Sequence, residues 1–154
     1  MERLKSLSRG TKLVLVAGPL LFVSLFLTWQ MVEVDFGPAG RADYPLDGWD
    51  VWGLQIGLLV IGLVSLVVVF HLTDVKLPDD IPWNTLMFAA GNAIFALTVV
   101  KNVTDAGSTW TSYIFVLLAA LIAVGTYLNW SEARSPEPPV VGYGRRGRGL
   151  SPTA

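Results

Sequence analysis

The sequence contains no cysteine, and this absence excludes disulfide bridges, cysteine-ligated metal centres and thiol catalysis. Charge is also scarce, because only 15% of the residues are Asp, Glu, Lys or Arg, against about 25% in a typical soluble domain. Hydrophobic residues instead make up 53% of the 154 residues, and the mean hydropathy is +0.55. This composition predicts a membrane protein.

Catalytic motifs are missing as well. The sequence has no H-E-x-x-H zinc motif, no G-x-S-x-G nucleophile motif and no glycine-rich phosphate-binding loop. The single histidine, His71, stands three residues before Asp74. A lone histidine near the end of an apolar segment more often contacts headgroups or backbone than acts as a base. We therefore predict no enzymatic activity and no cofactor.

Four long apolar segments contain most of the hydrophobic residues. They cover residues 13–29, 51–72, 81–100 and 111–130, and a helix of about 20 residues crosses a bilayer. The first segment follows a basic stretch, as in a secretory signal peptide, but no small-residue cleavage site follows it, so we expect it to be retained. The segments predict an all-α membrane protein, with an up-down bundle of four transmembrane helices over residues 13–130.

Basic residues are distributed unevenly around these segments. Nine of the eleven Lys and Arg residues lie within residues 1–12, at Lys76 or after Trp130. Cytoplasmic segments carry an excess of Lys and Arg, so we predict a plasma-membrane protein with both termini in the cytoplasm. Residues 1–12 would form a basic N-terminal segment, and the composition of residues 131–154 predicts a disordered tail. The Arg-Gly run at 144–149 permits contact with anionic lipid or RNA; we favour a topology signal and predict no nucleic-acid partner.

All six tryptophans fall at or beside the ends of the predicted segments. Tryptophan prefers the headgroup region, where its ring is half buried and its N–H stays wet. The predicted interfacial anchors are therefore Trp29, Trp49, Trp52, Trp83, Trp110 and Trp130. Asp50, Asp80 and Ser108 precede predicted helices and are good N-cap residue types. In the stretch DGWDVWG at 47–53, we thus expect Asp50 to cap the second helix and the two tryptophans to set its depth.

Residues 30–50 join the first two predicted helices and are acidic and aromatic. Residues 31–36 alternate apolar and acidic side chains, and Gly-Pro-Ala-Gly at 37–40 supplies a turn, so we expect a short extracellular loop or β-hairpin. The acidic side chains also permit a Ca²⁺ site. Its ligands would come from Glu33, Asp35, Asp43, Asp47 and Asp50. Their spacing fits no known loop pattern, and we predict no metal.

Small residues and one amide indicate how the helices pack. Gly53 and Gly57 form a G-x-x-x-G pair, with Gly62 a turn further on, and such spacing lets membrane helices approach closely. Asn92 lies near the middle of the third segment, where an unpaired amide is costly. We predict that it bonds to another helix, with a substrate contact as the alternative. The predicted packing residues are Gly53, Gly57, Gly62 and Asn92.

Two short motifs carry a resemblance to known families. The sequence LFLTW at 25–29 closes the first segment, and DGWDVWGL at 47–54 opens the second. This pattern resembles a family of small four-span membrane proteins of actinobacteria over residues 13–130. The resemblance implies a plasma-membrane location and points to no activity. The Trp52–Gly53–Leu54 element is more distantly similar to the first loop of claudin-type proteins, whose paired loop cysteines this chain lacks.

We expect a non-enzymatic membrane protein that serves as an accessory or assembly subunit of a membrane complex. Its partners would be the lipid bilayer and other membrane subunits, or copies of itself. The second hypothesis is a small oligomeric transporter or channel subunit, with Gln55, Asn92 and Thr98 along a path. No Asp or Glu lies well inside a predicted span, which argues against ion or proton coupling.

Overall fold

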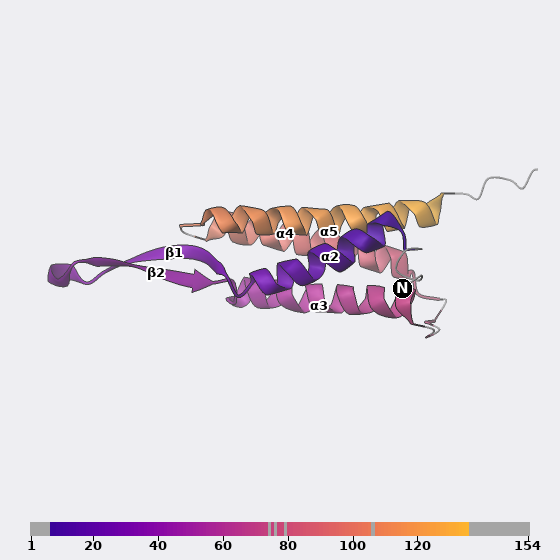
Figure 1. Cartoon of the computed structure of the whole chain (residues 1–154), viewed down its shortest axis with the longest axis horizontal. Helices are drawn as coiled ribbons and strands as arrows, with labels where there is room; N and C mark the ends of the chain where they lie inside the picture. Colours follow the sequence, from indigo (N-terminus) through magenta and orange to yellow (C-terminus); the bar gives the residue numbers. More distant parts are fainter. Residues whose placement is uncertain (1–6, 74, 76, 79, 106, 136–154) are drawn as a thin grey trace, which may run out of the picture.

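The computed structural model describes residues 7–73, 75, 77–78, 80–105 and 107–135. In these residues the elements are α2 (Arg9–Ser24), β1 (Thr28–Asp35), the 3-10 turn η1 (Gly37–Ala39), β2 (Arg41–Asp47), α3 (Val51–Leu72), α4 (Trp83–Thr104) and α5 (Trp110–Arg134). The four helices lie side by side, and the β1–β2 hairpin projects from one end of them (Figure 1). We call this the hairpin end. The other is the terminal end, because the described chain begins and ends there.

Three of the helices are long and apolar enough to cross a membrane: α3, α4 and α5, with 22, 22 and 25 residues. Helix α3 has the bounds that the sequence predicts. Helix α2 has 16 residues and spans about 24 Å, less than the ~30 Å hydrocarbon core of a bilayer. It begins earlier than the predicted segment 13–29. It also ends earlier, because the chain leaves the helix after Ser24 and turns into β1. Half of the predicted basic segment at 1–12 and most of the tail at 131–154 lie outside the described residues.

Each helix buries one stripe of residues against two neighbours. Helix α2 packs on α3 and α5, and α4 packs on the same two helices. The buried residues recur every three or four positions, which places them on one face of each helix. The core consists of Val14, Ala17, Leu21, Leu25, Trp29, Ile56, Val60, Leu63, Val67, Met87, Ile94, Phe115, Ala119 and Ile122. Large apolar side chains also point outward: Val16, Leu58 and Leu117 are at least 60% exposed, as expected of a protein in lipid.

Glycines set the closest helix approaches. A Cβ on Gly125 of α5 would lie 2.8 Å from the carbonyl oxygen of Gly10 in α2, so only glycine fits this crossing. Gly53 and Gly57 are buried, and a Cβ on Gly57 would lie 3.1 Å from the Trp49 ring. Gly62 is exposed, and a Cβ there would meet nothing within 4 Å. Within the described chain, Gly62 therefore has no packing role.

The helix starts agree with the sequence prediction at one of three positions. Asp50 Oδ1 accepts a hydrogen bond from Gly53 N at 2.7 Å and caps α3. Helix α4 begins two residues later than expected, after Pro82, whose carbonyl oxygen accepts from Thr85 N and Leu86 N, so Asp80 is not its cap. Helix α5 has Thr109 at the N-cap. Ser108 instead donates from Oγ to the Asn102 carbonyl oxygen at 2.8 Å and closes the end of α4.

The tight crossing of α2 and α5 gives a prediction with a matched control. Gly125→Ala should lower the free energy of unfolding by about 1–3 kcal/mol, because the new methyl meets backbone that cannot move aside. Gly62→Ala makes the same change in open space and should raise it by about 0.5–1 kcal/mol. Unfolding by SDS titration in mild detergent, followed by circular dichroism, measures both. Equal effects of the two substitutions would contradict the packing.

Candidate functional site: a projecting hairpin and its buried lysine

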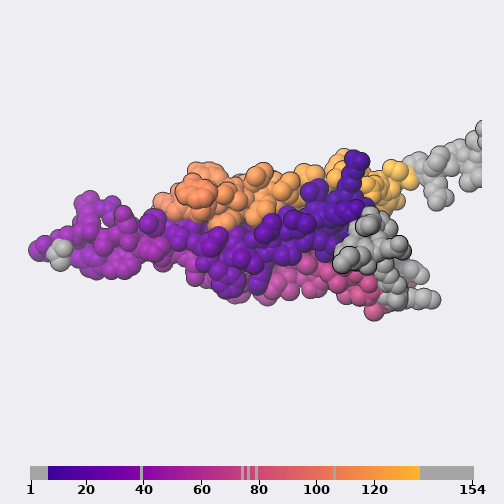
Figure 2. Space-filling view, viewed as in Figure 1, coloured from indigo at the N-terminus to yellow at the C-terminus, as the bar shows by residue number. Residues whose placement is uncertain are grey.

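The hairpin is the part of the molecule that stands apart from the helices (Figure 2). Strands β1 and β2 pair antiparallel from Thr28–Asp47 at the base to Asp35–Arg41 near the tip. Eight residues of β1 correspond to about 27 Å of extended chain. The tip turns at two glycines with positive φ, Gly37 and Gly40, and Gly37 N donates to Asp35 Oδ1 at 2.8 Å. The structure therefore confirms the predicted hairpin and extends it into an arm.

The two faces of the hairpin differ in chemistry. Side chains alternate between faces along a strand, so the register places Val32, Val34, Tyr44 and Leu46 together on one face. We call these four residues the apolar hairpin face. Phe36 extends this face at the tip, where its ring packs edge-on against Tyr44 with the ring centres 6.2 Å apart. Val34, Tyr44 and Leu46 are 36–49% exposed. An isolated two-stranded sheet is only marginally stable in water. An apolar face exposed to water adds a further free-energy cost.

The opposite face is acidic. Glu33 lies directly across from Asp43, and like charges in this position destabilise a strand pair. Arg41 offsets part of the repulsion through contacts of 3.2 Å to both Glu33 and Asp35. All three side chains are more than half exposed, so each ion pair contributes little to stability. Glu33 and Asp35 therefore share Arg41, whereas Asp50 contacts Lys101. The described acidic residues form no group of three that could hold a metal ion.

Backbone hydrogen bonds fix the base of the hairpin to the α4–α5 connection. Met31 N donates to the Gly107 carbonyl oxygen at 3.0 Å, and Thr109 N donates to the Trp29 carbonyl oxygen at 3.1 Å. Thr111 Oγ1 adds a bond of 2.7 Å to the carbonyl oxygen of Thr28. At the other strand, Gly48 N donates to the Leu25 carbonyl oxygen at 2.8 Å. Both strands are thus attached to the helices at the base.

Trp29 is the side chain that roots the hairpin in the helices. It is completely buried, and its ring lies 4.7 Å from that of Phe115 between ring centres. Its Nε1 donates to the Ser24 carbonyl oxygen at 3.1 Å. The prediction of an interfacial anchor does not fit this position, because the ring is completely buried among protein side chains and the indole N–H bonds to protein. The chain bends into β1 here, which turns Trp29 inward.

Lys101 is completely buried beside Trp29 and is held by two carboxylates. Its Nζ lies 2.6 Å from Asp50 Oδ2 and 2.9 Å from Asp105 Oδ2. It also lies 5.1 Å from the centre of the Trp29 ring, where a cation is attracted to the ring face. We call Lys101, Asp50, Asp105 and Trp29 the lysine cluster. The cluster joins the start of α3, the end of α4 and the base of the hairpin.

The carboxylate of Asp50 has two partners at once, since Oδ1 caps α3 while Oδ2 meets Lys101. Partial burial by itself raises the pKa of Asp50. Hydrogen bonds from Lys101, Gly53 and Trp52, together with the charge of Lys101, outweigh this effect and hold the pKa below its usual value of 3.8. Asp50 is therefore ionised at neutral pH and neutralises the buried lysine.

The spacing of the buried residues along α4 could have predicted that Lys101 is buried, although composition alone could not. Met87, Gly91, Ile94, Thr98 and Lys101 follow one another at alternating steps of four and three residues. This spacing keeps Lys101 on the buried face of α4. A lysine on such a face requires an acidic partner. Asp105 lies only four residues further along the chain, whereas Asp50 lies 51 residues away, and periodicity cannot identify that distant partner.

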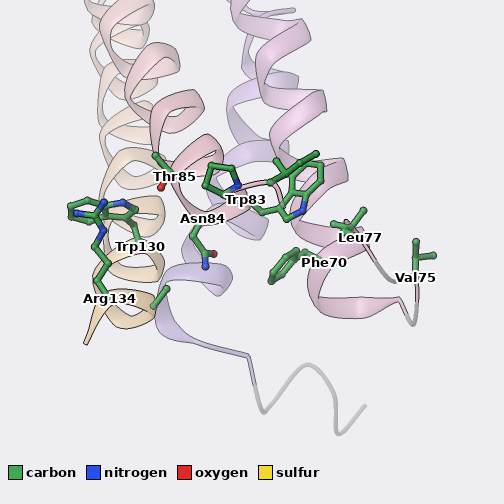
Figure 3. A pocket seen from close by; sticks show the side chains of 11 residues that line it. Phe70, Val75, Leu77, Trp83, Asn84, Thr85, Trp130 and Arg134 are labelled. Carbon is green, nitrogen blue, oxygen red and sulfur yellow. The ribbon is translucent and has the colours of Figure 1, made fainter. Parts of the chain in front are cut away.

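The remaining tryptophans divide between the two ends. Trp49, Trp52 and Trp110 lie at the hairpin end; Trp110 is 73% exposed and Trp52 is 39% exposed. Trp83 and Trp130 lie at the terminal end, where they line a groove of about 740 Å³ between α3, α4 and α5 (Figure 3). In this groove the Arg134 guanidinium stacks over Trp130, with its Cζ 4.1 Å from the ring centre. Trp83 Nε1 donates to the Pro78 carbonyl oxygen at 2.9 Å.

His71, the one titratable residue considered for catalysis, belongs to a polar contact among helices. Its Nε2 lies 3.3 Å from Thr11 Oγ1, and Ser8 Oγ donates to Asn129 Oδ1 at 2.6 Å beside it. Thr11 is completely buried. The contact joins α2, α3 and α5 at the terminal end. Asp74 lies outside the described residues.

The residues suggested for a transport path lie apart. Thr98 is buried and donates to the Ile94 carbonyl oxygen at 2.8 Å, whereas Gln55 and Asn92 are exposed on the outside of their helices. Asn92 Nδ2 donates to Phe88 of its own helix at 2.8 Å. The predicted bond from Asn92 to another helix is therefore not made within the described chain, because this side chain points away from the core.

The described residues hold no group of three His, Asp or Glu side chains able to bind a metal ion. What they do hold is an amphipathic arm, fixed at its base by a buried charge cluster and free along its length. No family model matches the chain, and neither a curated protein nor a solved structure matches it. The function must therefore be inferred from the geometry of the hairpin and its base.

The charges of the lysine cluster predict that a triple variant is more stable than one of its single variants. Lys101→Met should lower the free energy of unfolding in detergent by about 3 kcal/mol, because it leaves the buried Asp105 carboxylate without a cation. Adding Asp50→Asn and Asp105→Asn to Lys101→Met removes the remaining charges, so the triple variant should be more stable than the single one. A triple variant less stable than Lys101→Met would contradict a charge-balanced cluster.

Acid should weaken the cluster through Asp50. Because its folded pKa lies below the unfolded value of 3.8, its contribution is complete well above pH 3.8 and is lost as the pH falls through the folded pKa. The stability difference between the wild type and Asp50→Asn should therefore shrink as the pH falls below 3.8. SDS titrations across this range measure it. A difference that stays constant would show that the carboxylate charge contributes nothing.

Proposed function

We propose that this chain is a non-enzymatic integral membrane protein that acts as an accessory or assembly subunit, and that its hairpin binds the partner. The observation that carries the proposal is the exposed apolar hairpin face on an arm that is attached to the helices at its base. A preformed surface loses little conformational entropy on binding. Covering Val34, Tyr44 and Leu46 would also remove the cost of leaving them in water.

The geometry of the hairpin favours a partner that packs on the apolar hairpin face rather than one that adds a strand to the edge of the sheet. The outer edge of β1 is already bonded at its base to the segment from Gly107 to Thr109. Strand β2 contains Pro45, which has no N–H to offer a new strand. Side chains of the apolar hairpin face therefore provide the contact, with Tyr44 and Phe36 as aromatic anchors. The acidic reverse face stays in water.

The proposed topology places the hairpin outside the plasma membrane and both termini in the cytoplasm, with four spans in an up-down bundle. The distribution of Lys and Arg supports this orientation. Helix α2 is the short span, and the turn after it supports its crossing. Leu25 N, Phe26 N and Leu27 N each donate to the carbonyl three residues earlier. These three apolar residues add about 6 Å to the 24 Å of the helix, which reaches ~30 Å.

The test compares the two faces of the hairpin in complexes extracted with mild detergent. Wild-type chain should yield a foreign subunit in fixed stoichiometry by native mass spectrometry. The double variant Val34→Ser/Tyr44→Ser should recover at least about tenfold less of it, because aromatic anchors dominate binding energy. The control Glu33→Gln/Asp43→Asn, on the opposite face, should retain the partner. All these side chains are exposed, so the helix content should not change.

Two outcomes would overturn the proposal. One is a foreign subunit that both double variants retain equally, which would remove the hairpin from the interface. The other is a complex that contains only copies of this chain. That result would contradict the accessory role and would favour the small oligomeric transporter or channel.

A further inference from the structure

The outward face of α4 differs from the outward faces of the other helices. Thr85, Ala89, Asn92, Ala96 and Val103 are all exposed, and their spacing of three, four or seven residues places them on one side of the helix. We call these five residues the α4 face. The outward faces of α2, α3 and α5 instead carry large apolar side chains such as Val16, Leu58 and Leu117. At Ala89, Asn92 and Ala96, small residues and an amide thus stand where large apolar side chains usually meet lipid. The exposed large apolar residues of α4, which are Leu86, Val100 and Val103, lie on either side of this stretch.

Asn92 lies at the centre of the α4 face and near the middle of the helix. It is nine residues from Trp83 at the start of α4, which corresponds to about 14 Å, close to half the thickness of the hydrocarbon core. Its Nδ2 donates one hydrogen bond, to the Phe88 carbonyl oxygen. No donor reaches its Oδ1 from the part of the chain that the structure describes. Lipid tails offer no donor either, so the amide is left partly unsatisfied.

We propose that the α4 face binds the α4 face of a second copy of this chain, across a twofold axis along the membrane normal. Copies of one chain insert with the same orientation, so Asn92 of each copy lies at the same depth. An amide has both a donor and an acceptor, so two of them facing each other at one depth complement each other, as paired Asn residues do in parallel coiled coils. A foreign helix would need its own polar group at that depth.

The small residues of the α4 face make the contact sterically feasible. Ala89 lies three residues before Asn92, and Ala96 lies four residues after it. Small side chains on either side of a polar residue let two membrane helices approach until the polar groups bond. Helices α3 and α5 cover the other sides of α4, so the second copy binds without disturbing the core. The inference does not rest on the hairpin, since the two surfaces are separate.

Cysteine cross-linking of the purified chain in lipid vesicles tests the contact. Because the natural sequence has no cysteine, each single substitution reports on one position. Ala89→Cys and Ala96→Cys should form covalent dimers on mild oxidation. The controls Val16→Cys and Leu117→Cys, on exposed faces of α2 and α5, should not. Absence of dimer from both α4 positions, or equal cross-linking at all four, would overturn the proposal.

A second measurement tests the role of the amide. Asn92→Leu should weaken dimerisation about tenfold in energy-transfer measurements between labelled chains diluted in lipid. Its helix content should stay unchanged, because Asn92 is exposed. An unchanged dimer affinity would remove Asn92 from the interface. Both experiments use this chain alone, so their outcome is independent of whether the hairpin binds a foreign subunit.

Discussion

A lysine without solvent exposure at the end of a membrane helix imposes the strictest condition on this structure. Burying the Lys101 ammonium is costly unless opposite charges and hydrogen bonds surround it. Asp105 is the residue that follows α4, and Asp50 lies at the start of α3. Trp29 brings the hairpin to the same point. Neutralising one charge therefore fixes where three separate segments of the chain meet.

This condition also explains the polar turn before α3. Asp47 Oδ1 accepts from Trp49 N at 3.0 Å and bends the chain back toward the helices. The turn delivers Asp50 to a place where one oxygen caps α3 and the other meets Lys101. Toward the tip, the hairpin makes no such contacts with the helices among the residues that the structure describes, and an apolar face stays exposed. The attached base and the exposed apolar face are the two features that support the proposal that the hairpin binds a partner.

How much the sequence could predict depends on the range of the interactions. Apolar length identified the three long helices, and alternation with Gly-Pro-Ala-Gly identified the hairpin, because both are local properties. The pairing of Lys101 with Asp50 joins residues far apart in the chain, and no local pattern reveals it. Trp29 was misplaced for the same reason: its burial depends on Phe115 and Lys101. The sequence singled out Asn92 as a polar group in lipid, but only the structure shows that it faces outward.

Hydrogen exchange of the chain in a lipid bilayer tests most directly whether the lysine cluster holds the hairpin. The amides of Met31, Gly48 and Thr109 bond across the base of the hairpin, and in the wild type they should exchange much more slowly than the amides of the tip. Lys101→Met should accelerate exchange at these three positions and leave the middle of α3 and α5 protected. If base and tip exchange equally fast in the wild type, or if Lys101→Met leaves the base protected, the cluster does not hold the hairpin.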